Sequence, residues 1–97
     1  MKQDIYYLTV ISTRGMDNDK EIEKLIKEYE GHLDGAGTNL RTGERDLGAV
    51  FKYITNMKEF LIMAEENKLI KKSKSTFWIE SQFCDKSNNI PVRFLDY

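Results

Sequence analysis

The residues best suited to chemistry lie between Gly35 and Asp46. This stretch holds three of the six glycines of the chain, together with two arginines, two threonines and an asparagine. Glycine permits close backbone approach, so N–H groups here could hold an anion while arginine adds charge-assisted hydrogen bonds. One interpretation is therefore a binding site for a nucleotide or another phosphate compound. Its residues would be Gly35, Gly37, Thr38, Asn39, Arg41, Thr42 and Arg45.

The same stretch also fits a hairpin turn. Its glycine spacing matches neither the Walker A pattern nor G-x-G-x-x-G, and a strand rather than a helix follows it. Thr42-Gly43-Glu44 is typical of an ordinary turn. The spacing favours the hairpin, and the phosphate site remains the alternative.

Side chains for catalysis are scarce in this chain. It has one histidine, His32, and one cysteine, Cys84, which together cannot form a zinc site. His32 follows a predicted helix end, where imidazoles commonly stabilise the helix dipole, and Cys84 resembles a small hydrophobe at a strand end. Glu65 and Glu66 lie among lysines on a predicted helix. We therefore expect no enzymatic activity, no metal and no cofactor.

Composition indicates a single soluble domain that spans residues 1–97. The chain is 40% hydrophobic and 32% charged, as globular proteins are. A formal net charge of −1 argues against binding nucleic acid through bulk positive charge and against an acidic imitation of DNA. One cysteine allows no intrachain disulfide, and no apolar run approaches the length of a membrane span. We expect a cytoplasmic location.

Two amphipathic helices are predicted. The first begins at Asp17 or Asn18, with Asn18 and Glu21 spaced as a capping box, and ends at Gly31. The second begins at Asn56, with Glu59 at the reciprocal position, and frays through residues 68–72. Each carries one apolar stripe that must face a sheet.

The strands alternate with these helices. Residues 5–11 are β-branched and aromatic and predict a central strand, and residues 47–54 and 76–83 alternate with the period of a sheet. Residues 32–40 offer at most a short, weak strand, and residues 90–97 form either an edge strand from Pro91 or a loose tail. The order β-α-(β)-β-α-β predicts an α+β, ferredoxin-like fold. Its antiparallel sheet would have two helices on one face and an optional C-terminal edge strand.

The sheet face that the helices leave open is the second candidate site. If Leu8 faces the helices, alternate residues point away and form a partly aromatic surface, which marks an interface with a protein partner or a second copy. The interface residues would be Tyr7, Thr9, Ile11, Lys52, Trp78, Glu80 and Gln82, with Val50 beside them. Alternatively, the C-terminal segment covers this face with Val92, Phe94, Leu95 and Tyr97.

An RNA-recognition domain shares this fold and stacks bases on the same face. Residues 45–52 keep the first, fourth and sixth positions of its third-strand signature, but Leu47 and Ala49 replace the stacking aromatics and Lys52 ends the motif. Because stacking dominates such binding, RNA is not an expected partner. We expect a non-enzymatic binding module, with a size and lysine- and glutamate-rich composition typical of accessory proteins such as phage-encoded inhibitors. A phosphate-sequestering protein is the alternative.

Overall fold

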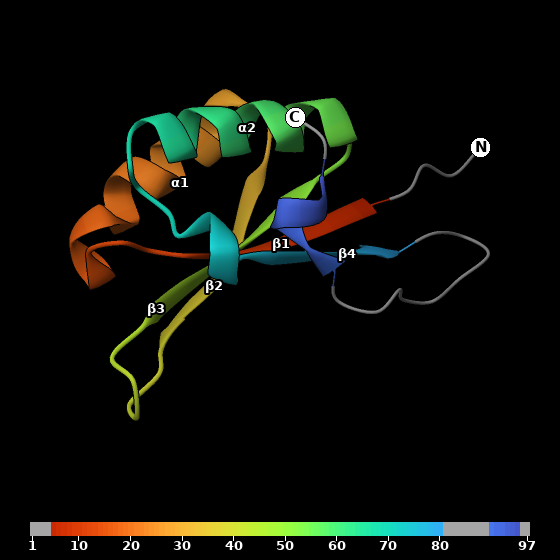
Figure 1. Ribbon diagram of the computed structural model, residues 1–97. Helices are drawn as coiled ribbons and strands as arrows, with labels where there is room; N and C mark the ends of the chain where they lie inside the picture. The colour runs from red at the N-terminus through yellow and green to blue at the C-terminus, as the bar shows by residue number, and fades with distance from the viewer. Residues whose placement is uncertain (1–4, 81–89, 96–97) are drawn as a thin grey trace.

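Strand β1 (Ile5–Ile11) lies at the centre of one antiparallel sheet. The computed structural model describes residues 5–80 and 90–95. The other main elements are α1 (Asp19–Glu28), β2 (His32–Thr38), β3 (Arg45–Phe51), α2 (Ile54–Glu66), β4 (Thr76–Glu80) and β5 (Ile90–Pro91). The sheet order is β2-β3-β1-β4-β5, and helices α1 and α2 cover the same face (Figure 1). The α+β prediction is confirmed, and the ferredoxin-like arrangement holds in outline.

The core lies between the helices and one face of the sheet. Leu8 and Val10 are buried from β1, and their antiparallel partners Ala49 and Leu47 are buried on the same face. The Phe51 ring meets the α2 Phe60 ring at a centroid distance of 5.6 Å. The helices contribute the buried residues Ile22, Leu25, Ile26, Met57, Phe60, Leu61 and Ala64. The apolar stripes of both predicted helices therefore face the sheet as expected.

The start of α1 differs from the prediction. A 3-10 turn, η1 (Gly15–Asn18), precedes it, and Asn18 occupies the N-cap position without a side-chain capping bond. The Asn18 Nδ2 instead donates to the Thr13 hydroxyl at 3.0 Å and to the Leu69 carbonyl at 3.1 Å. The predicted capping box with Glu21 is therefore wrong, because buried partners take the asparagine amide.

The start of α2 also differs. The helix begins at Ile54, two residues before Asn56, with Tyr53 at the N-cap and no side-chain capping bond. The Asn56 amide lies in the first turn and donates to the Glu30 carboxylate at 3.2 Å. The second capping box is wrong as well.

The end of α1 is a Schellman motif centred on Glu30. The Gly31 N–H donates to the Ile26 carbonyl at 2.9 Å and the Glu30 N–H to the Lys27 carbonyl at 3.1 Å. Glu30, at φ 62°, takes the left-handed position that the sequence favoured for glycine. Gly31 follows it for a different reason, because a Cβ there would collide with Phe51.

The end of α2 repeats this motif with Lys68 at φ 56°. The Leu69 N–H donates to the Ala64 carbonyl and the Lys68 N–H to the Glu65 carbonyl, both at 2.9 Å. The predicted fraying through residues 68–72 is therefore wrong, because the chain leaves the helix at a fixed turn. None of the described helices is long and apolar enough to cross a bilayer.

Two strand predictions need correction. β2 is a full seven-residue edge strand rather than a weak one, and β3 runs from Arg45 to Phe51 rather than over residues 47–54. Pairing along β3 holds β2 in place despite its glycines, with a register shift between Leu33 and Gly35. The prediction for residues 76–83 is met as far as Glu80, and the remainder lies outside the described residues.

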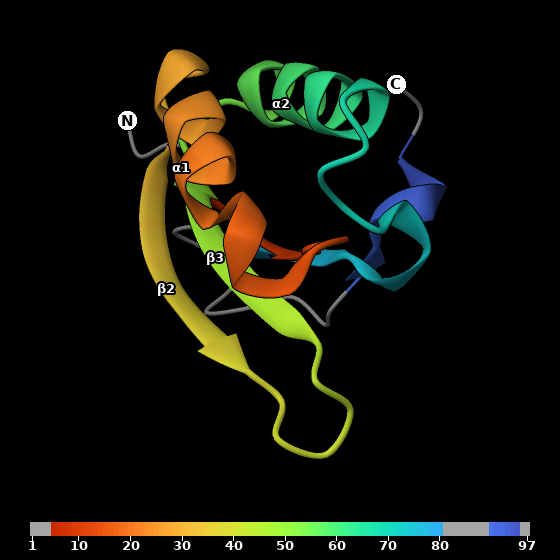
Figure 2. The ribbon, with the colours of Figure 1, turned by 90° about the vertical axis from the view of Figure 1, so that its left-hand side faces the viewer.

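The described C-terminal segment packs on the helix side of the sheet. β5 is a two-residue edge strand beside β4, and the 3-10 turn η3 (Val92–Phe94) follows it. Val92 is fully buried and Leu95 packs against the core. Figure 2 shows η3, in blue, beside the cyan 3-10 turn η2 (Lys72–Lys74). The alternative in which Val92 and Leu95 cover the open face is therefore wrong, because both side chains pack against the core on the helix side. Residues 96–97 lie outside the described residues.

Candidate functional site

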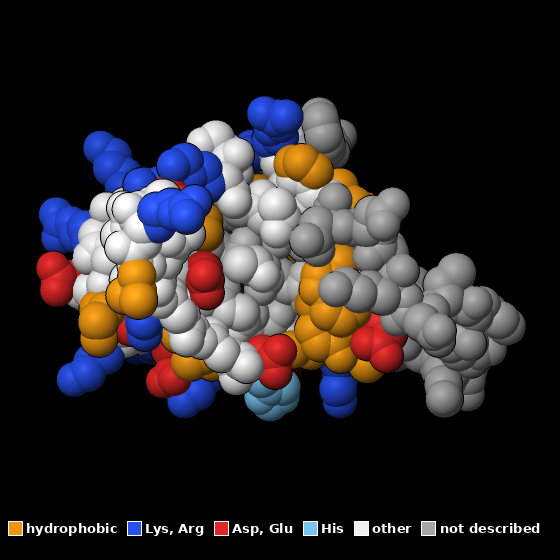
Figure 3. Space-filling model, turned by 90° about the horizontal axis from the view of Figure 1, so that it is seen from below, with side chains coloured by type: hydrophobic (Ala, Val, Ile, Leu, Met, Phe, Trp, Pro, Cys, Tyr) orange, Lys and Arg blue, Asp and Glu red, His pale blue; other side chains and the backbone are white. Residues whose placement is uncertain are grey.

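The sheet face opposite the helices carries a stacked aromatic pair. Tyr7 and Trp78 are direct partners across β1 and β4, with ring centroids 3.9 Å apart and planes 7° from parallel. Both side chains are half-buried. They lie on this face because they alternate with Leu8 and Phe77, which point into the core. Seen from the open side, hydrophobic side chains gather on the sheet (Figure 3).

The surroundings of Tyr7 are negatively charged. Partial burial raises the pKa of the Tyr7 hydroxyl, and the charge of Glu80, a hydrogen bond to its carboxylate and the charge of Asp34 raise it further. Asp34 reaches this position at the register shift in β2, beside Gly48. Tyr7 therefore stays a neutral hydrogen-bond donor between two carboxylates, and a cationic or donor group would complement this surface.

The remaining predicted interface residues lie at different places. Thr9 is half-buried next to the aromatic pair along β1, and Ile11 lies at the far end of β1 opposite Asp46. Lys52 is exposed just beyond β3, at the same end of the sheet as Tyr7. Gln82 lies outside the described residues. Five of the seven predicted residues therefore share one face, and Lys52 adjoins it.

The stretch between β2 and β3 is a hairpin whose turn satisfies its own backbone donors. The Asn39 N–H donates to the Glu44 carbonyl and the Gly43 N–H to the Asn39 carbonyl, both at 2.7 Å. The Asn39 side-chain oxygen accepts from the Arg41 and Thr42 N–H groups, and the Thr42 hydroxyl accepts from the Glu44 N–H. Gly43 takes the positive φ of 76° that the turn requires. These N–H groups point at one another's acceptors rather than at a common anion.

The residues predicted for phosphate do not converge on one point, although the Arg45 Nη1 donates to the Thr38 hydroxyl at 3.1 Å. Gly35, Gly37 and Thr38 belong to β2, with the strand geometry of its ladder. Arg45 lies in β3 and binds the Asp19 carboxylate through two nitrogens, at 3.3 Å and 2.7 Å. The Asp19 hydrogen bond is also the main reason why the pKa of Arg45 is raised. This geometry corresponds to the hairpin interpretation.

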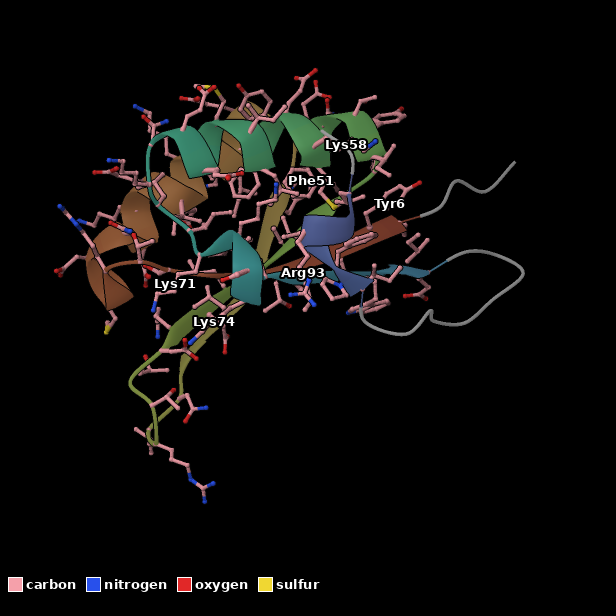
Figure 4. All side chains as sticks on the ribbon, in the orientation of Figure 1. Tyr6, Phe51, Lys58, Lys71, Lys74 and Arg93 are labelled. Atoms are coloured by element: carbon pink, nitrogen blue, oxygen red, sulfur yellow. The ribbon has the colours of Figure 1, made fainter. Side chains whose placement is uncertain are left out.

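Sequence reasoning missed how the hairpin is held. Glu44, at its base, forms ion pairs with Lys71 and Lys74, the second of which lies in the 3-10 turn η2 (Lys72–Lys74). The Lys74 hydrogen bond lowers the pKa of Glu44. Figure 4 shows Lys71 and Lys74 beside the hairpin. No local pattern signals these pairs, because the partners are about thirty residues apart in the chain.

The hairpin projects from the sheet on its open side. Figures 1 and 2 show β2 and β3 continuing below the sheet, away from both helices. Leu40, at the tip, is 98% exposed. The aromatic pair and the projecting tip thus belong to the same side of the molecule.

A surface hollow and a metal site are the two other kinds of site that the described residues could offer. The hollow of about 460 Å³ lined by Ile62, Glu65, Glu66 and Lys72 is open and lies on the helix side of the sheet. Among residues 5–80 and 90–95, no three His, Cys, Asp or Glu side chains are grouped so that they could share a metal ion.

The fold and site together define a small α+β protein with one helix-covered sheet face and one aromatic face flanked by carboxylates. Comparison of the chain with protein-family models, with curated proteins and with solved structures finds no match.

Proposed function

We propose that the protein is a non-enzymatic binding module whose open sheet face contacts a protein partner. The observation that carries this proposal is the stacked Tyr7–Trp78 pair on the side that neither helix covers. Aromatic side chains contribute disproportionately to the affinity of protein interfaces. Stacking also fixes both rings before a partner arrives, so that less conformational entropy is lost on binding.

The residues around this pair support a protein rather than a nucleic acid as the partner. Ile5, Ile11 and Val50 share the face by strand alternation and add apolar area. Asp34 and Glu80 give the region around Tyr7 a negative potential, which repels phosphate groups. A protein surface with apolar residues and a basic side chain fits both properties.

Substitution on the open face tests this proposal. Tyr7→Glu and Trp78→Glu each place a charge in the aromatic pair, and we expect both to abolish partner capture or self-association. Thr9→Arg is a milder variant that leaves the rings intact. Tyr53→Glu is the matched control, since Tyr53 is 47% exposed at the start of α2.

Circular dichroism should show that all four variants retain the fold. Sedimentation and pull-down behaviour that is unchanged in every open-face variant would refute the proposal.

A further inference from the structure

We propose that the occupant of the open sheet face is a second copy of this chain, with the hairpin tip of each copy against the Tyr7–Trp78 end of the other. This inference rests on the proposed function, because it names the partner of the same face. It adds the hairpin, residues 38–45, as the second half of the interface.

The hairpin tip is exposed and has a fixed conformation, as a preorganised contact surface requires. Leu40 is 98% exposed, and Arg41 beside it is exposed and has no ion pair among the described residues. The hydrogen bonds of the turn and the ion pairs of Glu44 with Lys71 and Lys74 hold the tip in one shape. A loop already fixed in its bound shape loses little entropy on association.

The two ends of the sheet place the hairpin and the aromatic pair far apart within one copy. Ile11 pairs with Asp46 at the hairpin end, whereas Ile5 pairs with Glu80 at the opposite end. The hairpin joins β2 and β3, whereas the aromatic pair bridges β1 and β4, so the two features also lie towards opposite edges of the sheet. A two-fold axis parallel to the sheet and perpendicular to the line that joins the hairpin to the aromatic pair brings two open faces together with both their ends and their edges reversed. Each hairpin then meets the aromatic end of the other copy, as an isologous interface requires.

Charge complementarity favours this reversed arrangement. The hairpin end presents Arg41, Lys71 and Lys74 against the carboxylates of Glu44 and Asp46. The aromatic end presents Glu80 and Asp34 on either side of Tyr7 against the cation of Lys52. The first end is therefore net positive and the second net negative. Reversal therefore creates two equivalent contacts between Arg41 and Glu80, whereas pairing without reversal would bring like charges together.

The size of the face explains why the hairpin is needed. Seven residues at about 3.3 Å each, across three strand spacings of about 4.8 Å, give a flat area of about 330 Å². A stable interface buries about 800 Å² per partner. The open face alone falls short of this area, and two projecting hairpins, each against the other copy, supply additional contact.

The experiment is sedimentation equilibrium of the purified chain over a range of concentrations. We expect a concentration-dependent species of twice the 11.4 kDa monomer mass. Leu40→Asp and Arg41→Glu should each weaken dimerisation at least tenfold, whereas Lys24→Glu, on the exposed side of α1, should not. Thermal melts check that each variant is folded.

Charge exchange gives the decisive result. Glu80→Lys alone should also weaken the dimer, but an equimolar mixture of R41E and E80K should form a heterodimer in which both contacts are restored. Failure of the mixture to dimerise would overturn the inference. A monomer at every concentration would overturn it too and leave the open face to a foreign protein. A dimer that Tyr7→Glu abolishes but the hairpin variants do not affect would refute the hairpin contact and retain the proposed function.

Discussion

Replacing Gly31 by alanine tests the packing between the end of α1 and the start of β2. A Cβ at this position would lie 2.6 Å from the Phe51 Cε1 atom and 2.9 Å from the Ile26 Cγ2 atom. Non-bonded carbons prefer separations of about 3.5–4.0 Å. Phe51 is 1% exposed and Ile26 is 0% exposed, so neither side chain has solvent into which it can move.

The expected cost follows from these contacts. Overpacking a core costs about 1–3 kcal/mol, and the lower entropy of alanine in the unfolded chain returns about 0.4–1 kcal/mol. We expect Gly31→Ala to lower the free energy of unfolding by about 1–2 kcal/mol, and the melting temperature by about 4–16 °C. Urea unfolding followed by the fluorescence of Trp78, the single tryptophan, measures this change.

Gly35→Ala is the matched control. Gly35 has ordinary φ, and a Cβ there would meet nothing within 4 Å. The control should be neutral or stabilising by up to about 1 kcal/mol. If Gly31→Ala is as stable as Gly35→Ala, the tight packing described for the end of α1 is wrong.

Two further predictions concern a helix end and the base of the hairpin. Lys68→Gly should raise the free energy of unfolding by about 0.5–1 kcal/mol, as measured by urea titration. Glycine removes the cost of about 1–2 kcal/mol that a side chain incurs in the left-handed conformation, and it adds a smaller entropic cost. A loss of stability would contradict this explanation. The hydrogen bond from Lys74 lowers the pKa of Glu44 in the folded state below its ordinary value of 4.5. Ionised Glu44 therefore stabilises the fold fully at pH values above 4.5, and this contribution is lost as the pH falls through the lowered pKa of the folded state. In thermal melts from about pH 7 to about pH 3, the wild type should therefore lose its advantage over Glu44→Gln, and a constant difference would show that the ion pairs contribute nothing.

Much of the fold could be predicted because its signals are local. The β-branched and aromatic run of β1 specifies a central strand, and the alternation of Leu8 with Tyr7 assigns each side chain to a face. The same alternation correctly places Trp78 on the open face. These inferences need only the period of a strand and the apolar stripes of two helices.

The errors arise where distant residues compete for a local group. Asn18 has the type and spacing of a capping residue, but the Leu69 carbonyl, 51 positions away, takes its amide. The ion pair of Arg45 with Asp19 and those of Glu44 are equally non-local. Sequence alone could therefore identify the hairpin stretch but not its shape, its projection or its exposed tip.

The two margins of the sheet differ in a way that limits uncontrolled assembly. Among the described strands, β2 presents seven residues at one margin, whereas β5 presents two at the other, including a proline that lacks an N–H. Backbone pairing between molecules therefore favours β2, and joining two β2 strands uses the long margin of both molecules. The two sheets would then form one continuous sheet with the short, proline-containing strand β5 at each outer edge, and this edge disfavours further growth into a fibril.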